Sequence, residues 1–149
     1  MRNKTMTKVH GKNAVLFLDD AAGTCRNMTA DLTNISLTRS KSLSETTTFG
    51  DGSAQREVDG IRDAGIDVSG IFNTTADVTA IVGMLDQMYS GSLWTRAQYL
   101  PAGSITGCPV YTASMALSNY AIAEPTDGVT TVQFSLQLAS GSVVAACCV

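Results

Sequence analysis

Residues 129–139 have the sequence VTTVQFSLQLA, in which apolar and polar side chains alternate. A period of two is that of a β-strand with one buried face. The side chains expected to face a core are Val132, Phe134, Leu136 and Leu138. The opposite face includes Gln133, Ser135 and Gln137 and has no charge, although exposed strands are usually protected by charge. Such a face suits a surface that a partner covers or one that must stay neutral. We predict these three polar residues as self-association candidates.

Outward from this stretch, the chain is predicted to be rich in strands and to contain a single helix. Alternation and short apolar runs predict further strands at residues 14–18, 34–40, 64–72, 93–100, 110–115 and 117–122. Apolar residues at helical spacing predict one amphipathic α-helix over about residues 75–89, with Thr74 and Asp77 as a capping box and Gly91 as the C-terminal cap. A length of 149 residues favours one domain, residues 1–149.

The composition excludes several classes of protein. Hydrophobic residues make up 44% of the chain, enough for a core, but only 15% of residues are charged, where about 25% is typical. The chain has 18 Thr and 14 Ser, residue types that suit strands and turns better than helix interiors. A helical bundle and a disordered chain are therefore both disfavoured. No stretch approaches the roughly 20 apolar residues of a membrane-spanning helix, so we expect no membrane anchor.

The charges are distributed unevenly. Residues 1–12 form a basic N-terminal arm with four basic side chains and no acid, which suits either a solvated terminus or contact with an anionic surface. The other 137 residues hold 6 basic and 13 acidic groups, so that 6 − 13 gives a net charge of −7. Tight binding of a phosphate backbone requires Lys and Arg, so this acidic body is not expected to hold nucleic acid tightly.

The segment of about residues 39–59 has almost no apolar anchors and contains an Asp-Gly turn signal at Asp51. Twenty residues without a core face are uncommon in a compact domain and indicate a functional loop or a projecting hairpin.

The last seven residues, 143–149, are all apolar. An exposed segment of this kind is prone to aggregation. It is therefore expected to be covered, either by the sheet of its own chain or by a neighbouring subunit. Val143, Val144 and Val149 are accordingly further self-association candidates.

Residues for catalysis are mostly missing, and we expect neither an enzyme nor a cofactor or metal site. His10 is the only histidine and lies near the N-terminus, which disfavours His-dependent catalysis. The acid pairs Asp19/Asp20 and Asp63/Asp67 lie beside turns or strands, where solvated carboxylates are common. Trp94 belongs to a group of aromatic residues that also includes Tyr99 and Tyr111. Such a group fits either a sugar-binding platform or core filling.

The order of several short motifs resembles that of the tail tube proteins of long-tailed bacteriophages. The motifs are residues 12–20 (KNAVLFLDD), 31–37 (DLTNISL), 45–51 (ETTTFGD), 60–64 (GIRDA), 66–70 (IDVSG) and 99–103 (YLPAG). The resemblance extends over about residues 10–145 and includes a helix after the fifth motif and a pair of strands at the C-terminus. Tail-terminator and injection-tube proteins share this architecture.

The resemblance implies an antiparallel β-sandwich or β-barrel subunit with one flanking helix and no catalytic activity. Six copies would close into a ring, and stacked rings would form a virion tail tube around a tape-measure protein. In that picture the segment of about residues 39–59 would reach an adjacent subunit or ring, and the alternative is a mobile surface loop. The candidate residues for this contact are Arg39, Lys41, Glu45, Phe49, Asp51, Arg56, Glu57 and Asp59. The implied partners are further copies of the chain, the tape-measure protein, a tail terminator and distal tail or baseplate proteins. DNA would pass through without specific binding, and assembly would take place in the host cytoplasm. The alternative hypotheses are a monomeric β-sandwich adhesin or carbohydrate-binding module and a related terminator or injection-tube protein.

Overall fold

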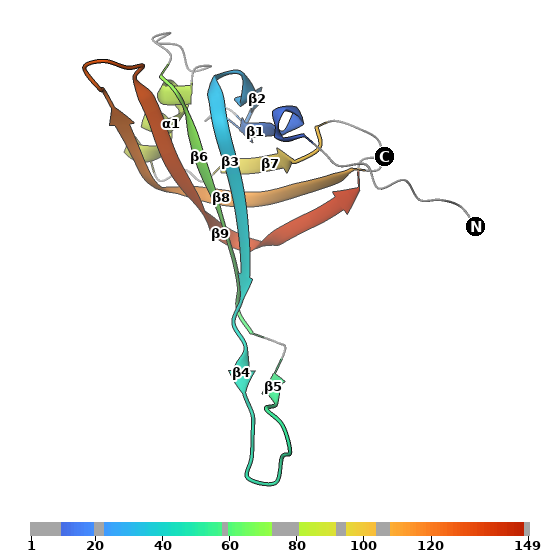
Figure 1. Cartoon of the computed structure of the whole chain (residues 1–149). Helices are drawn as coiled ribbons and strands as arrows, with labels where there is room; N and C mark the ends of the chain where they lie inside the picture. The colour runs from blue at the N-terminus through green and yellow to red at the C-terminus, as the bar shows by residue number, and fades with distance from the viewer. Residues whose placement is uncertain are drawn as a thin grey trace.

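The computed structural model describes residues 10–19, 23–57, 60–72, 81–91, 95–103 and 108–147, and the main body is one strongly curved sheet (Figure 1). The strands of this sheet are β1 (Val15–Asp19), β2 (Cys25–Asn27), β3 (Leu32–Lys41), β6 (Arg62–Ile71), β7 (Thr95–Leu100), β8 (Pro109–Ala123) and β9 (Thr131–Cys147). A second, two-stranded sheet consists of β4 (Ser44–Glu45) and β5 (Arg56–Glu57). The helices are α1 (Ile81–Ser90) and two 3-10 turns, η1 (Gly11–Asn13) and η2 (Thr29–Asp31).

The spatial order of the seven strands is β2-β1-β7-β8-β9-β6-β3, and all neighbours are antiparallel. The predicted alternation is confirmed in β9: Val132, Phe134 and Leu136 are buried, whereas Gln133 and Gln137 are exposed. In β6 the pattern is equally regular, because register pairs Val68 with Phe134 and Ile66 with Leu136 on the same face. Each of these two strands therefore contributes one apolar and one polar face.

The core lies on the concave face of the curved sheet. One cluster of buried residues joins side chains from β1, β6, β7, β8, β9 and α1. Leu16, Leu85 and Leu136 are among its fully buried members, with 0% exposure. The predicted class, mainly antiparallel β with one flanking helix, is confirmed. The sandwich-like closure comes from the curvature of a single sheet, since the guanidinium carbon of Arg39 in β3 lies 5.7 Å from the ring centre of Tyr111 in β8, three strands away.

Helix α1 packs against β8 on the side of the core. Its Leu85 and Met88 enter the core cluster, and Tyr89 makes an edge-to-face contact with Tyr120 at 5.9 Å between ring centres. The Tyr120 hydroxyl donates a hydrogen bond to Asp86, which raises the pKa of that phenol. The helix was predicted over about residues 75–89. Its end agrees, with the Gly91 amide donating to the carbonyl of Gln87, whereas residues 73–80, including the expected cap, lie outside the described part.

Strand β8 differs from the prediction. Residues 110–115 and 117–122 were expected to form two strands, but they form one 15-residue strand. The register with β9 shifts between Thr112 and Ser114, between Ser114 and Met115, and between Leu117 and Asn119. Such bulges let a long strand bend without ending, which accounts for both the interrupted alternation and the curvature of the sheet.

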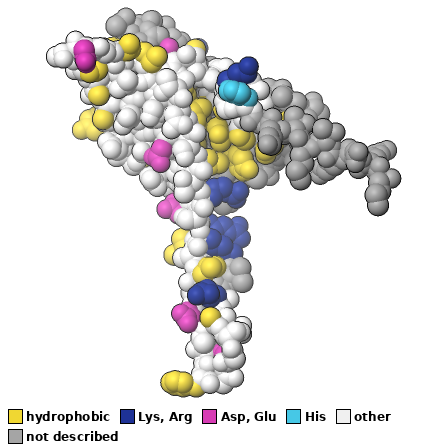
Figure 2. Space-filling view, viewed as in Figure 1, with side chains coloured by type: hydrophobic (Ala, Val, Ile, Leu, Met, Phe, Trp, Pro, Cys, Tyr) yellow, Lys and Arg dark blue, Asp and Glu magenta, His cyan; other side chains and the backbone are white. Residues whose placement is uncertain are grey.

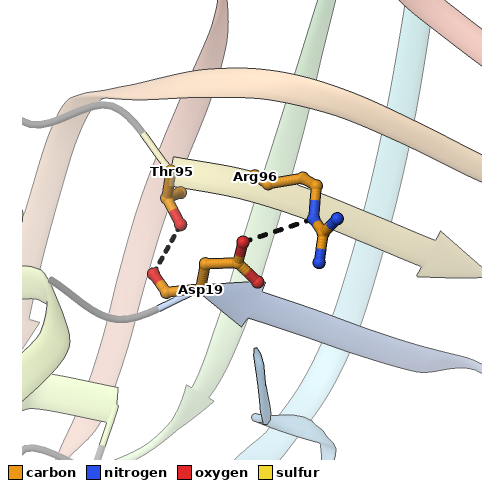
Figure 3. Close-up of polar contacts among 3 residues, drawn as sticks. All are labelled: Asp19, Thr95 and Arg96. Carbon is orange, nitrogen blue, oxygen red and sulfur yellow. Dashed lines mark hydrogen bonds and ion pairs between the residues drawn. The ribbon is translucent and has the colours of Figure 1, made fainter. Parts of the chain in front are cut away.

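The β1 strand is attached to β7 by side-chain contacts at its end (Figure 3). The Thr95 hydroxyl donates to the main-chain carbonyl of Asp19 at 2.6 Å, and Arg96 Nε lies 3.2 Å from Asp19 Oδ2. Thr95 is a buried polar residue of the described part, so its satisfied hydroxyl avoids a desolvation cost. Asp19 thus joins the end of β1 to Thr95, 76 residues away in the chain, through its carbonyl, and to Arg96 through its carboxylate.

We predict that Leu136→Ala lowers the free energy of unfolding by about 2–5 kcal/mol, because it leaves a cavity in the core. The adjacent Gln137→Ala, on the exposed face of the same strand, should change it by less than about 0.5 kcal/mol. Urea unfolding followed by circular dichroism, at one low protein concentration, measures both. Equal effects of the two substitutions would contradict the assigned faces.

Candidate self-association surfaces

The first candidate surface is a projecting hairpin, residues 42–61, which extends away from the sheet beyond β3 and β6 (Figure 1). At its base the Ser42 amide donates to the Ile61 carbonyl at 2.9 Å and the Ile61 amide donates to Ser42 Oγ at 2.9 Å. Further out, the Thr46 amide donates to the Gln55 carbonyl at 3.0 Å. Of the two forms that the sequence left open, a loop or a hairpin, the structure has the hairpin.

The hairpin exposes three large apolar side chains: Leu43 is 54%, Ile61 83% and Phe49, at the tip, 113% exposed. Figure 2 shows an exposed hydrophobic side chain at the free end of the projecting hairpin. Large apolar side chains on a thin projection have little to pack against within their own subunit. They indicate a surface for a partner.

The charged residues of this segment that were predicted to make contacts lie in different parts of the structure. Arg39 and Lys41 belong to β3 rather than to a loop, and Glu45 and Arg56 face each other across β4 and β5. Asp51 closes the tip turn, because its Oδ2 accepts hydrogen bonds from the Thr48 amide at 2.7 Å and the Thr48 hydroxyl at 3.0 Å. Asp51 thus stabilises the tip turn, and its contact with another subunit stays a prediction. Glu57 lies in β5, but its side chain is not described, and Asp59 lies outside the described residues.

A basic cluster lies where the hairpin leaves the sheet, and we call Arg39, Lys41 and Arg62 the root cluster. Lys41 and Arg62 are opposite each other in the register, and all three line one cavity of about 370 Å³ together with Asp63. Figure 2 shows Lys and Arg side chains gathered at this position. Arg62 was missing from the sequence prediction. The turn signal at Asp51 could have identified it, because counting outward from this turn along both strands places Arg62 opposite Lys41.

The second candidate surface is the outward face of β3, β6, β9 and β8. In register across these strands, Asn34 pairs with Ser69, Ser69 with Gln133, and Gln133 with Ala121. The next row includes Asp67, whose Oδ1 accepts a hydrogen bond from the Ser135 hydroxyl at 2.7 Å. We call these outward residues the polar face. Ser135 is thus bonded within its own subunit, whereas Gln133 and Gln137 are exposed.

The position of β9 determines which parts of the strand are available for the predicted self-association. From Thr131 to Gln137 the strand is paired with β6 on one side and with β8 on the other, so it offers a partner side chains but no free backbone edge there. Beyond Gln137 the described pairing is with β8 alone, and Val144 pairs with Thr112. The backbone around Val143 and Val144 is thus covered on one side by its own sheet, and Val149 lies outside the described residues.

The aromatic residues considered for sugar binding are arranged differently from an open platform. Tyr99 and Tyr111 stack on each other at 6.5 Å between ring centres, and Arg39 lies over Tyr111. Both rings are half-buried, and burial together with the neighbouring Tyr111 raises the pKa of Tyr99. Trp94 lies outside the described residues. This pair connects β7 and β8 to β3 across the concave face.

Two other kinds of site were considered in the described part of the chain. It contains no group of three His, Cys, Asp or Glu side chains placed to hold a metal ion. Within the same residues, no helix has the length and apolar character needed to cross a bilayer. The candidate carboxylates Asp63 and Asp67 lie on β6 and are bonded, to the Ala64 amide and the Ser135 hydroxyl respectively.

The fold and these surfaces define a β-rich structural subunit whose prominent features are contact surfaces. The model of the phage tail tube protein family matches residues 8–144, which is most of the chain. The chain therefore belongs to the phage tail tube protein family and is a structural component of the phage tail. No curated protein sequence is significantly similar to it.

Solved structures with similar folds come from several tail assemblies. A chain from the tail of an empty gene transfer agent particle, described with C6 symmetry, has a TM-score of 0.76 at 17% identity, over 93% of this chain and 99% of that one. A chain of the SPP1 tail tube has a TM-score of 0.74 at 9% identity, over 94% and 80%. A chain of the anti-feeding prophage baseplate has a TM-score of 0.70 at 7% identity, over 94% and 96%.

We predict that Gly60→Ala displaces the base of the projecting hairpin. A Cβ atom at Gly60 would lie 1.4 Å from the Ser42 main-chain oxygen, so the two strands must separate and the Ser42–Ile61 hydrogen bonds must weaken. Amide hydrogen exchange at Ser42 should become roughly tenfold faster or more, because local opening controls this rate. In the control Gly52→Ala, a Cβ atom would meet no atom within 4 Å, and the rate should not change. Equal rates in the two variants would contradict the close approach.

Proposed function

We propose that six copies of this chain close into a ring and that rings stack into the tail tube, with the projecting hairpin contacting an adjacent subunit. The observation that carries the proposal is the exposure of Leu43, Phe49 and Ile61 on the hairpin, away from any core of their own. Interface cores are depleted in charge and contain large apolar side chains, as this surface does. The C6 symmetry of the gene transfer agent tail supports the number of copies.

Ring closure is supported by the edges of the sheet. The seven-stranded sheet ends in β2 and β3, and β9 beyond Gln137 is paired with β8 alone in the described residues. Unpaired strand edges bind further strands through main-chain hydrogen bonds. In a ring each edge would receive a neighbour, and Val143 and Val144 would lie at such an edge. This arrangement would also protect the edges from non-specific aggregation.

The polar face would line the channel of the tube. On β3, β6 and β9, up to Gln137, its outward residues are Ser, Thr, Asn, Gln and Gly together with the carboxylates Asp63 and Asp67 and, at the end of β6, Ile71. Arg39, Lys41 and Arg62 alternate to the opposite face. A wall of this kind would not retain phosphate, because retention depends on basic side chains. Gln133, Ser135 and Gln137 would then face a tape-measure protein and, later, passing DNA.

The remaining partners follow from the position of a tail tube in a virion. One end of the tube would contact a tail terminator and the other the distal tail or baseplate proteins, and assembly would take place in the host cytoplasm. The similarity to a chain of the anti-feeding prophage baseplate supports contact between related folds at the distal end.

The proposal predicts that the purified chain forms rings and tubes, which negative-stain microscopy and light scattering detect. Replacing residues 43–60 with Asn-Gly, which joins the paired Ser42 and Ile61 through a tight turn, should leave a folded subunit that forms no tubes. The removed apolar contacts are those available for stacking. Circular dichroism that matches that of the full-length chain controls for the folding of the shortened variant.

Two results would contradict the proposal. A full-length chain that stays monomeric at every concentration would argue against self-assembly as its function. Normal tubes from the shortened variant would remove the hairpin from the contact while leaving self-assembly intact.

A further inference from the structure

The exposed large apolar side chains of the described residues gather at two opposite ends of the molecule. Leu43, Phe49 and Ile61 lie on the projecting hairpin. At the other end of the sheet lie Ile71, Tyr89, Ile122 and Val129. Strand β6 connects the two ends, from Arg62 beside the hairpin to Ile71, which pairs with Thr131 at the start of β9. Ten strand residues at about 3.3 Å each separate the two ends by roughly 30 Å. The course of β6 between them can be followed in Figure 1.

The charged side chains also differ between these two ends of the molecule. The loop that connects β8 and β9, residues 124–130, carries the exposed acids Glu124 and Asp127 and no base; we call it the acidic turn. The root cluster at the opposite end carries three bases and one neighbouring acid, Asp63, whose Oδ1 accepts the Ala64 amide at 2.8 Å. Figure 2 shows acidic side chains at the extremity of the sheet and basic ones at the base of the hairpin.

From this placement we infer that the acidic turn of one copy docks against the root cluster of a second copy, head to tail. The inference rests on the proposed function and names the surfaces through which stacking takes place. Glu124 and Asp127 would enter the cavity lined by Lys41 and Arg62. The apolar Ile122 and Val129 flank the acids, and Leu43 and Ile61 adjoin the bases, so each end offers charge surrounded by apolar surface.

Other relative orientations of two copies are less favourable. An end-to-end contact related by a two-fold axis would bring either two root clusters or two acidic turns together, and like charges in contact cost several kcal/mol. A head-to-tail contact pairs opposite charges and leaves each end free for another copy, which is the geometry of an open-ended stack. Net charge alone does not explain this preference, because copies with the same total of −3 repel unless their charges are arranged by position.

The test exchanges charges between the two ends. The turn variant carries Glu124→Lys and Asp127→Lys, and the root variant carries Lys41→Glu and Arg62→Glu. Arg39 is left in place because it packs over Tyr111. Each variant alone should need at least about a tenfold higher concentration than the unaltered chain to form tubes, a difference of about 1.4 kcal/mol. Turbidity and negative-stain microscopy at 0.1 M salt measure this concentration.

Two recombined samples restore opposite charges at every contact. In an equimolar mixture of the two variants, lysines of the turn variant meet glutamates of the root variant, while the unaltered acidic turn meets the unaltered root cluster. The fourfold variant, with all four substitutions in one chain, restores the pairing with reversed sign. Both samples should form tubes at close to the original concentration, and their growth should weaken as salt is raised to 1 M.

The fourfold variant is also the control for folding, since it contains every substitution that the single-end variants contain. Tubes from the unaltered chain together with unimpaired growth of both single-end variants would overturn the inference and leave the proposed function standing. Failure of both recombined samples, when all chains are folded by circular dichroism, would overturn it as well. Absence of tubes from the unaltered chain would instead contradict the proposed function itself.

Discussion

The architecture depends on one constraint: a single sheet packs a core against only one of its two faces. Alternation sends Val132, Phe134 and Leu136 to the concave side, where they meet the apolar residues of β6, β8 and α1. The convex side of the same strands then has no layer of its own to pack against in the described residues. A protein of this design must leave that face to solvent or to another molecule, and its side chains are accordingly short and polar. The polar face that the subunit presents to its surroundings follows from having a core on only one side of the sheet.

The sequence predicted which side chains of a strand are buried better than it predicted which strands lie next to each other. The period of two in residues 129–139 identifies the buried side chains of β9, but no local pattern states that β9 lies between β6 and β8. Pairing is a long-range property: β1 binds β7 through Val15 and Leu100, and the residues between them contain most of the other strands. The bulges of β8 were invisible for a related reason, since a bulge disrupts the alternation from which a strand is predicted.

The candidate surfaces were predicted in part. The scarcity of apolar anchors in residues 39–59 located the projecting hairpin, and Phe49 is fully exposed as its position suggested. The role of Asp51 could not be predicted, because a carboxylate that closes a turn and one that faces a partner have the same sequence signature. Arg62 was missed because a base at the start of an alternating strand has no meaning until the register places it opposite Lys41.

The position of β9 also bears on how the chain is synthesised. It is the last strand of the described chain, yet it lies inside the sheet. Until it emerges from the ribosome, β2, β1, β7 and β8 form one group of strands and β6 and β3 another, with no described strand to join them. An incomplete polypeptide consequently has half a core and two additional unpaired edges, and quality-control proteases act on such states. The closing of the sheet, and with it the completion of the core, therefore waits for β9.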